Sequence, residues 1–180
     1  KEANDCAVIQ DVVNKNSDIG VVSFTNLNEG CWNNILKRGE LVFHEISENK
    51  LHIIVGQKNP LYDSEEVNIE DLAHFPMIFL SHDYNKWTHE EANVLGLNDN
   101  PLMTQVSSRD LLIKTVAPTM GVAFGLRPFN SAVSEYYSYQ QIKSIPCNIP
   151  NFYIKVGYIK QDTSTAVVNE FISLFEQSYS

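Results

Sequence analysis

Residues 102–128 read LMTQVSSRDLLIKTVAPTMGVAFGLRP. The short run at 102–107 predicts a strand, and GVAFGLRPF (121–129) predicts a second strand followed by a Gly-Leu-Arg-Pro loop. The residues between these two strands, 107–121, carry the apolar spacing of a helix. A strand, a helix and a strand in close succession are typical of an α/β protein.

The helix in this stretch has recognisable signals at both ends. Ser107 or Ser108 is expected to cap its first turn, because a serine hydroxyl accepts a hydrogen bond from a free backbone N–H there. We expect Pro118 to distort the last turn and Gly121 to end the helix. The positions that form the predicted apolar face are Leu111, Leu112 and Val116.

The same alternation extends outward to both ends of the chain. Strands are predicted at 19–24, 41–47, 50–56, 77–81, 102–107, 121–124, 142–147 and 152–160. Helices are predicted at 3–15, 31–36, 68–76, from about 88, at 107–121, near 130–140 and at 164–175. Strands that alternate with helices predict an α/β fold with mostly parallel sheets.

Three local expectations follow from this pattern. The polar segment Ser47-Glu48-Asn49 is predicted to be a turn between the strands at 41–47 and 50–56. His44 and His52 are placed on a partly solvated face of those strands. Thr163 or Ser164 is expected to cap the closing helix, whose apolar side is predicted to hold Ala166, Val167, Phe171, Leu174 and Phe175.

Composition narrows the class of protein. The chain has 180 residues, of which 43% are hydrophobic and 19% charged, as in an ordinary folded domain or a pair of small lobes. Its formal net charge of −9 argues against direct contact with DNA phosphates, so any action on DNA needs another segment. The three cysteines have no paired spacing, which suggests reduced thiols in a cytoplasm. No apolar run reaches membrane-spanning length.

The chain opens at Lys1 without a methionine and enters a helical pattern almost at once. We therefore expect it to be a fragment of a longer protein. The preceding segment would be either a signal peptide or a DNA-binding domain.

Polar residues follow four of the predicted strands. In open α/β sheets ligands settle at the carboxyl ends of strands, beside helix N-termini. The candidate ligand-binding residues at these ends are Ser23, Thr25, Ser81, His82, Ser107, Ser108, Gly125 and Arg127. Hydroxyls and a guanidinium suit a small anionic ligand, a carboxylate above all. The alternative is that each serine is only a helix cap.

The chain has three arginines, two of which lie near these strand ends. Arg127 follows Gly125 and precedes Pro128, so a turn holds its backbone, and it is the preferred contact for an anion. Arg109 is predicted to face solvent from the helix, with the pocket as the alternative. The alternative for Arg127 is a surface ion pair of little energetic weight.

No motif for a metal, a cofactor or catalysis is present. The spacing of His82, Asp83, His89 and Glu90 matches no standard zinc arrangement. The chain has no G-x-S-x-G elbow, no phosphate loop and no G-x-G-x-x-G, and its cysteines lack a neighbouring base. We therefore predict no enzyme activity, no metal and no cofactor.

The order of five segments resembles the effector-binding domain of LysR-type transcriptional regulators, over nearly the whole chain. These segments are SDIGVV (17–22), KLHIIVGQKNPL (50–61), VNIEDLAHFPMIFL (67–80), VSSRDLLIKTVAPTMGVAFGLRP (106–128) and STAVVNEFISLF (164–175). Two of them depart from the family pattern. Asn59 stands where a histidine is usual, and GLRP replaces the usual leucine-proline, which implies a ligand preference of its own.

The resemblance implies a two-lobed fold like that of type 2 periplasmic binding proteins, with Rossmann-like lobes joined by two crossing strands. One lobe would be 1–57 plus 152–180, and the other 58–151. Family domains begin with a strand, a helix and a strand before the helix at 3–15, so the first lobe is expected to be incomplete at its N-terminus.

The resemblance also implies partners and a site. The family's regulators bind DNA through an N-terminal winged helix-turn-helix and usually form tetramers, so a homo-oligomer is expected for the full-length protein. A small effector would occupy the cleft between the lobes. The pocket positions carried over from the family are the same strand-end residues, Ser23 to Arg127, reached above.

Three functions remain to be compared. The first is the cytoplasmic ligand sensor of a LysR-type transcription regulator, in which the effector shifts the balance between open and closed lobes. The second is an extracytoplasmic solute-binding protein of a transporter, which a signal peptide encoded upstream of Lys1 would favour. The third is an enzyme on the same scaffold, which would need a polar catalytic set among residues such as Ser23, Thr25 and Ser107.

Overall fold

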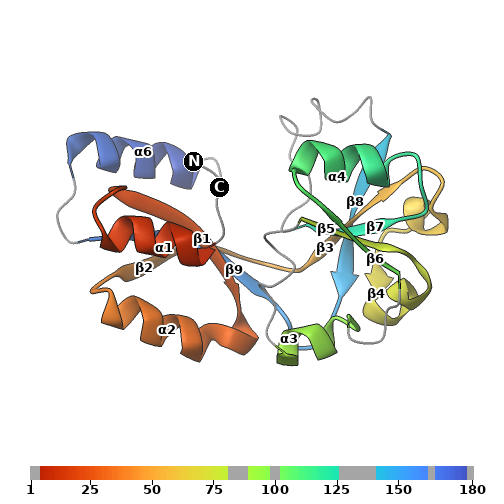
Figure 1. The fold of residues 1–180 in the computed structure, drawn as a ribbon, viewed down its shortest axis with the longest axis horizontal. Coiled ribbons are helices and arrows are strands. Elements are labelled where there is room, and N and C mark those ends of the chain that lie inside the picture. Colours follow the sequence, from red (N-terminus) through yellow and green to blue (C-terminus); the bar gives the residue numbers. More distant parts are fainter. Residues whose placement is uncertain (1–4, 81–88, 98–101, 126–140, 162–164, 178–180) are drawn as a thin grey trace. The chain divides into compact units, whose positions relative to one another are not determined.

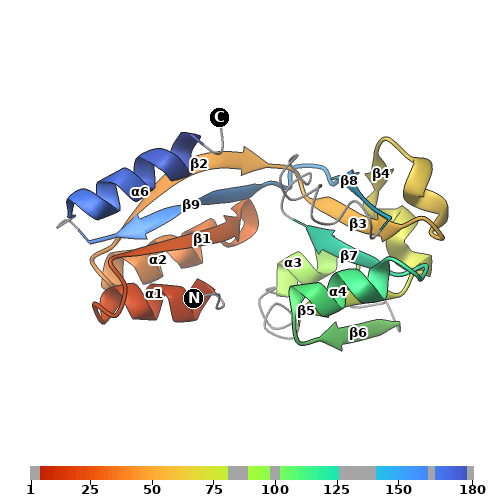
Figure 2. The same cartoon turned by 90° about the horizontal axis from the view of Figure 1, so that it is seen from above.

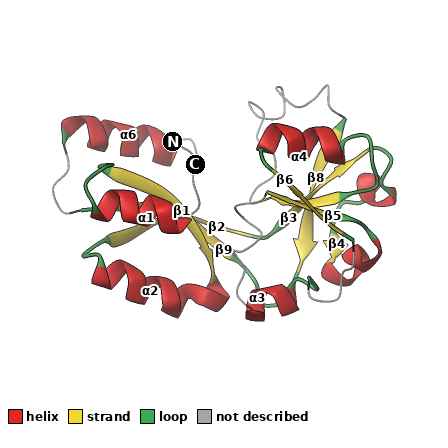
Figure 3. Cartoon of the chain, in the orientation of Figure 1, coloured by secondary structure: helices red, strands yellow, loops and turns green. Residues whose placement is uncertain are grey.

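The structure, a computed structural model, describes residues 5–80, 89–97, 102–125, 141–161 and 165–177 (Figure 1). Its helices are α1 (Asp5–Val13), α2 (Glu29–Arg38), α3 (His89–Val94), α4 (Arg109–Val116) and α6 (Ala166–Gln177), with 3-10 turns η1 (Asn26–Asn28), η2 (Pro60–Asp63) and η3 (Ile69–His74). Its strands are β1 (Ile19–Thr25), β2 (Val42–Asn49), β3 (His52–Gly56), β4 (Val67–Asn68), β5 (Met77–Leu80), β6 (Met103–Val106), β7 (Val122–Gly125), β8 (Ile142–Asn148) and β9 (Ile154–Lys160). Helices and strands are interspersed as predicted, which confirms the α/β class (Figure 3).

The chain divides into two compact units. Unit 1 comprises Lys1–Asn49 and Tyr153–Ser180, and unit 2 comprises Lys50–Phe152. The chain therefore enters unit 2 once, after β2, and returns once, before β9. Strand β3 belongs to unit 2 because it pairs with β7 and β8, whereas the sequence analysis assigned residues 50–56 to the first lobe.

Unit 1 is a three-layered arrangement around a sheet of strand order β1-β9-β2. Helices α1 and α2 lie on one face and α6 on the other (Figure 2). The buried core under α1 and α2 is formed by Ile9, Val12, Val22, Phe24, Trp32, Leu36, Leu41 and Ile159. The core under α6 is smaller and consists of Tyr158, Val168 and Ile172. Neighbouring residues Tyr158 and Ile159 enter opposite cores because side chains alternate along a strand.

Unit 2 is built on a sheet of strand order β4-β8-β3-β7-β5-β6. Strand β3 is antiparallel to both of its neighbours, and the remaining pairs, β4 with β8 and β5 with β6 and β7, are parallel. All strands of this sheet except β3 consequently run in one direction. Helix α4 covers one face and buries Leu112, Ile113 and Val116 against it.

The prediction of mostly parallel pairing is wrong for the described strands. Four strand pairs are antiparallel and three are parallel. The physical reason is that one reversed strand lies inside each sheet, β9 between β1 and β2, and β3 between β7 and β8. Each reversed strand follows a passage of the chain from one unit to the other.

Two local expectations also change. Ser47-Glu48-Asn49 is not a turn, because β2 continues through Asn49 with a register shift between Glu45 and Ser47. Helix α4 ends at Val116, ahead of Gly121. Pro118 has no N–H to continue the helix, and the N–H of Thr119 bonds to Val116 O in a tighter turn (3.1 Å).

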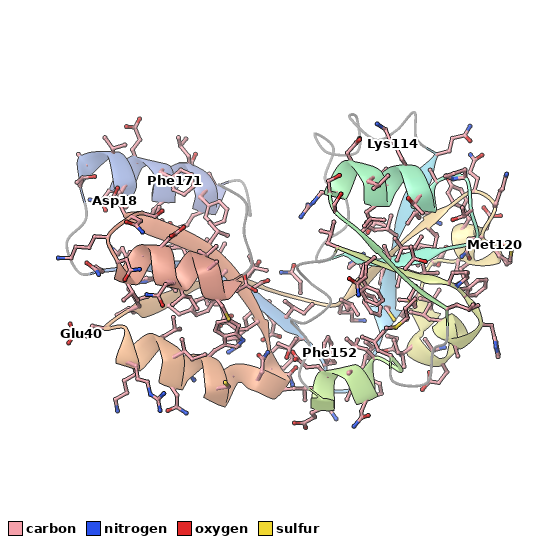
Figure 4. The ribbon with its side chains drawn as sticks, viewed as in Figure 1. Asp18, Glu40, Lys114, Met120, Phe152 and Phe171 are labelled. Atoms are coloured by element: carbon pink, nitrogen blue, oxygen red, sulfur yellow. The ribbon has the colours of Figure 1, made fainter. Side chains whose placement is uncertain are left out.

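The buried side of α6 was predicted only in part. Val168 and Ile172 are buried, with Phe175 packed beside them. Of the predicted apolar positions, Val167, Phe171 and Leu174 are exposed by 75%, 45% and 61% (Phe171 in Figure 4). The helix carries two neighbouring apolar stripes, so its periodicity could not decide which of them meets the sheet. None of the helices in the described ranges is long and apolar enough to cross a bilayer.

Candidate functional site

The carboxyl end of β1 gathers polar side chains in unit 1. Ser23 lies level with Val156 of β9 and Ser47 of β2, and the next row of this face joins Thr25 to Ile154 and Asn49. Directly opposed residues share one face of a sheet. Ser23, Thr25, Ser47 and Asn49 therefore lie on the same face, at the same end of the sheet.

Only half of this polar group, Ser23 and Thr25, was predicted from the sequence. Ser23 and Thr25 are buried, at 7% and 3% exposure, which is unusual for hydroxyl residues without a structural or ligand role. Ser47 and Asn49 were missed because they were assigned to a turn. They are hydrogen-bonded to each other, from Asn49 Nδ2 to Ser47 Oγ (2.9 Å).

The segment after β1 is fixed in place by a reciprocal hydrogen-bond pair. Asn26 N–H donates to Tyr153 O (3.1 Å), and Tyr153 N–H donates to Asn26 Oδ1 (3.0 Å). Thr25 occupies the cap position of η1 without a cap hydrogen bond from its side chain.

On the opposite face of the unit 1 sheet, Lys155 forms ion pairs with carboxylates of its own unit. Its Nζ lies 3.2 Å from Glu29 Oε1 and 3.3 Å from Glu45 Oε2. The hydrogen bond to Glu29 is the main cause that raises the pKa of Lys155, and Glu45 adds to it. This cation is on the α2 side of the sheet, away from the face that carries Ser23.

In unit 2 the carboxyl ends of the strands line up in one row. Val106 of β6 lies level with Leu80 of β5. Strands β5 and β7 pair at Met77 and Val122, and counting three residues onward along each strand places Leu80 level with Gly125. Gly125 is opposite His52. The row thus runs from β6 through β5 and β7 to β3, and its side chains share the face that α4 covers.

The structure describes Ser107 and Ser108 as exposed residues between β6 and α4. Ser108 is the helix cap, because its hydroxyl accepts a hydrogen bond from Leu111 N–H (3.3 Å). The capping interpretation is thus confirmed for Ser108, while Ser107 has no such bond among the contacts of α4. Arg109 is exposed at the first position of α4, as expected.

His52 is a member of this row that sequence analysis did not select. It was placed on a partly solvated face, and that prediction is wrong, because its side chain is only 8% exposed. Its ring Nδ1 lies 3.2 Å from Ser144 Oγ on β8. Burial is the main cause that lowers the pKa of His52, and the positive charge of Lys50 lowers it further. A reversed β3, which starts where its neighbours end, could not be predicted from local patterns.

Three of the selected residues, Ser81, His82 and Arg127, lie outside the described residues. The assignment of Arg127 as the anion contact remains a prediction.

The described side chains are suited to hydrogen bonding more than to covalent chemistry. Hydroxyl, amide and imidazole groups at two strand-end clusters can bind the oxygen atoms of a small polar molecule. No carboxylate is hydrogen-bonded to His52 in the described part of the chain, so the Ser144–His52 pair has no third group of a triad there. Within the same ranges no three His, Cys, Asp or Glu side chains are grouped to hold a metal.

The comparisons with known proteins agree on one family. The model of the LysR substrate binding domain matches residues 3–180. A search of curated protein sequences finds no match. Among solved structures, the effector-binding domain of QuiR in complex with shikimate is similar, with a TM-score of 0.66 and 16% identity over 98% of this chain and 78% of that chain.

Two further solved structures share the fold. HinK, a LysR family transcriptional regulator from Pseudomonas aeruginosa, aligns with a TM-score of 0.69 and 13% identity over 100% of this chain and 60% of its own. The reduced form of the OxyR regulatory domain from Pseudomonas aeruginosa aligns with a TM-score of 0.63 and 14% identity, over 98% and 78% of the two chains. At these identities the likeness concerns the fold.

Proposed function

The chain belongs to the LysR substrate-binding domain family, and from this premise we propose that it senses a small organic acid through its polar strand ends. Family membership places it with the ligand-sensing domains of LysR-type regulators and not with the solute-binding proteins of transporters. The chemical class of the effector and the residues that bind it are the proposal.

The observation that carries the proposal is the burial of Ser23 and Thr25 at the end of β1. Ser47 and Asn49 extend the same polar face. Hydroxyl and amide donors bind carboxylate oxygens with charge-assisted hydrogen bonds, which are stronger than bonds between neutral groups. QuiR, whose structure contains shikimate, is a precedent for a ring carboxylate on this fold.

The role of the whole protein follows from its charge. At a formal net charge of −9 this chain does not bind DNA phosphates well, so we propose that an N-terminal domain contacts DNA in a homo-oligomeric, cytoplasmic regulator. Effector binding would bias that domain by favouring one arrangement of the regulator. The chain itself would bind its ligand without converting it.

A thermal-unfolding screen tests the proposal. The chain is heated with a panel of small organic acids that includes shikimate, benzoate, succinate and 2-oxoglutarate. An acid present at 100 times its Kd stabilises the folded state by about 2.7 kcal/mol, which moves the midpoint upward by several degrees. A regulator's effector is recovered unchanged, so mass analysis of the incubated acid also tests for turnover.

The matched variants are Ser23→Ala and Ser17→Ala. Ser17 is an exposed serine near the opposite end of β1. Ser23→Ala should reduce the shift by the active acid, while Ser17→Ala should leave it unchanged. The absence of a shift with every acid of the panel would contradict the proposal.

A further inference from the structure

The direction of β3 brings its first residue to the ligand-binding edge of unit 2. Every other strand of the sheet runs the opposite way, so β3 begins where β5, β6 and β7 end. His52 is that first residue. The carboxyl ends of parallel strands are where α/β sheets bind ligands.

The two cross-strand partners of His52 carry no polar side chain. Its partner across β7 is Gly125, which has no side chain, and its partner across β8 is Pro146. Further along the row Leu80 and Val106 are apolar and buried. His52 is therefore a polar ring at the edge of an apolar core, where a buried polar group is costly unless it is hydrogen-bonded.

Ser144 fixes the orientation of this ring. The contact between Ser144 Oγ and Nδ1 (3.2 Å) occupies one of the two ring nitrogens. Burial and the nearby Lys50 lower the pKa of His52, so the ring is neutral at neutral pH and carries a single N–H. When the serine hydroxyl donates to Nδ1, the proton is on Nε2, and Nε2–H is a free donor.

We propose that His52, positioned by Ser144, donates a hydrogen bond from Nε2–H to an oxygen of the bound acid and is a specificity-determining residue of the site. This inference rests on the proposed function and adds one contact to it. A neutral donor selects an oxygen acceptor in a defined direction without adding charge, which distinguishes its role from that of an arginine. Ser144 is a positioning residue in this arrangement.

The first test reads the tautomer in the free protein. Long-range ¹⁵N–¹H spectra of the histidine rings distinguish a proton on Nε2 from one on Nδ1. We expect the Nε2–H form for His52, and its ring signals should move when the acid that gave the largest thermal shift in the panel is added. A proton on Nδ1, donated to Ser144, would overturn the inference.

The second test measures affinity for the same acid by calorimetry. His52→Leu removes both ring nitrogens and should weaken binding about tenfold. His52→Gln keeps an N–H donor at the ε position and should retain affinity within about threefold of the parent chain. Ser144→Ala should weaken binding by a smaller factor than His52→Leu, because it removes only the orientation of the ring.

Controls separate the role in binding from a structural role. His44→Leu changes a histidine of unit 1 that stacks on Tyr158 near the start of β2, away from the carboxyl end of that strand, and should leave affinity unchanged. Urea unfolding of each variant shows that the fold persists. If an acid binds the parent chain and His52→Leu binds it equally well, this inference fails while the proposed function stands. If no acid of the panel binds, the proposed function fails and this inference with it.

Discussion

Asn59 shows how one side chain can hold a loop at a distance along the chain. Its side chain is 2% exposed. Its Nδ2 donates to Met120 O (2.7 Å), and its Oδ1 accepts from Leu61 N–H (2.9 Å). Asn59 thus fastens the start of η2 to the turn between α4 and β7, where Figure 4 labels Met120.

Replacement of Asn59 by alanine should lower the free energy of unfolding by about 1–3 kcal/mol, because it leaves Met120 O without this donor. Chemical unfolding in urea measures the change. Asn33→Ala, at an exposed position of α2, is the control and should stay within about 0.5 kcal/mol of the parent chain. Equal stability of the two variants would contradict the structural role of Asn59.

Cys147 should be the unreactive member of the three cysteines. Its burial, and secondarily the negative charges of Glu70, Asp71 and Glu66, raise the pKa of its thiol to about 12. Cys6 and Cys31 are exposed. Since the thiolate is the reactive form, iodoacetamide at neutral pH should alkylate Cys6 and Cys31 in the folded chain and Cys147 only in denaturant. Mass spectrometry of the adducts tests this, and equal labelling of Cys147 in the folded chain would refute it.

The lowered pKa of His52 makes the free energy of unfolding depend on pH. Its pKa is lower in the folded chain than the ordinary value of 6.5, so the unfolded chain binds more protons as the pH falls through that value. The free energy of unfolding should therefore decrease on acidification, beginning near pH 6.5 and continuing down to the lowered pKa of the folded state. Urea unfolding between pH 7.5 and 5.5 measures the slope. His52→Gln should flatten the slope in this window, and an identical slope would rule out His52 as its source.

At the scale of elements, the start of α4 has two adjacent serines, Ser107 and Ser108, of which only Ser108 caps the helix. Ser108→Ala should cost about 1 kcal/mol of stability, because it removes the acceptor for Leu111 N–H at the start of the helix. Ser107→Ala, one residue earlier, should leave stability nearly unchanged. Thermal unfolding of both variants tests this, and a loss from Ser107→Ala as large as that from Ser108→Ala would show that the capping assignment is incorrect.

The elements themselves were predictable where local signals agreed. β6, α4 and β7 were predicted from residues 102–128 because apolar spacing, a capping serine and a proline expected to distort the last turn lie together there. Half of the polar group at the end of β1 was predicted because Ser23 and Thr25 lie at the carboxyl end of a predicted strand. Ser47 and Asn49 were not, because polar residues at the end of a strand resemble a turn when only the sequence is read.

The order of strands was beyond local reasoning. β9 lies between β1 and β2 although more than a hundred residues separate it from both in sequence. The periodicity of residues 152–160 does not indicate that β9 pairs with β1 and β2. The antiparallel direction of β3 likewise has no signal in its local sequence. The mistaken expectation of mostly parallel pairing and the omission of His52 from the site both follow from these long-range placements.

At the scale of the whole molecule, each unit has its own sheet and its own polar strand end. In unit 1 this end carries Ser23, Thr25, Ser47 and Asn49, and in unit 2 it carries His52 beside Gly125. A ligand-sensing domain needs residues that contact the effector on elements that are otherwise rigidly packed. Both clusters meet this requirement, since they lie at the ends of strands whose other residues form the cores.

The most direct test of the account is a map of backbone amide shifts in ¹⁵N–¹H spectra as the acid with the largest thermal shift is added. We expect saturable shifts concentrated at the strand ends, at Ser23, Thr25, Ser107 and Gly125, together with Asn49 and His52. Saturable shifts confined to other surfaces, such as the exposed stripe of α6, would contradict it. So would a spectrum that no acid of the panel changes.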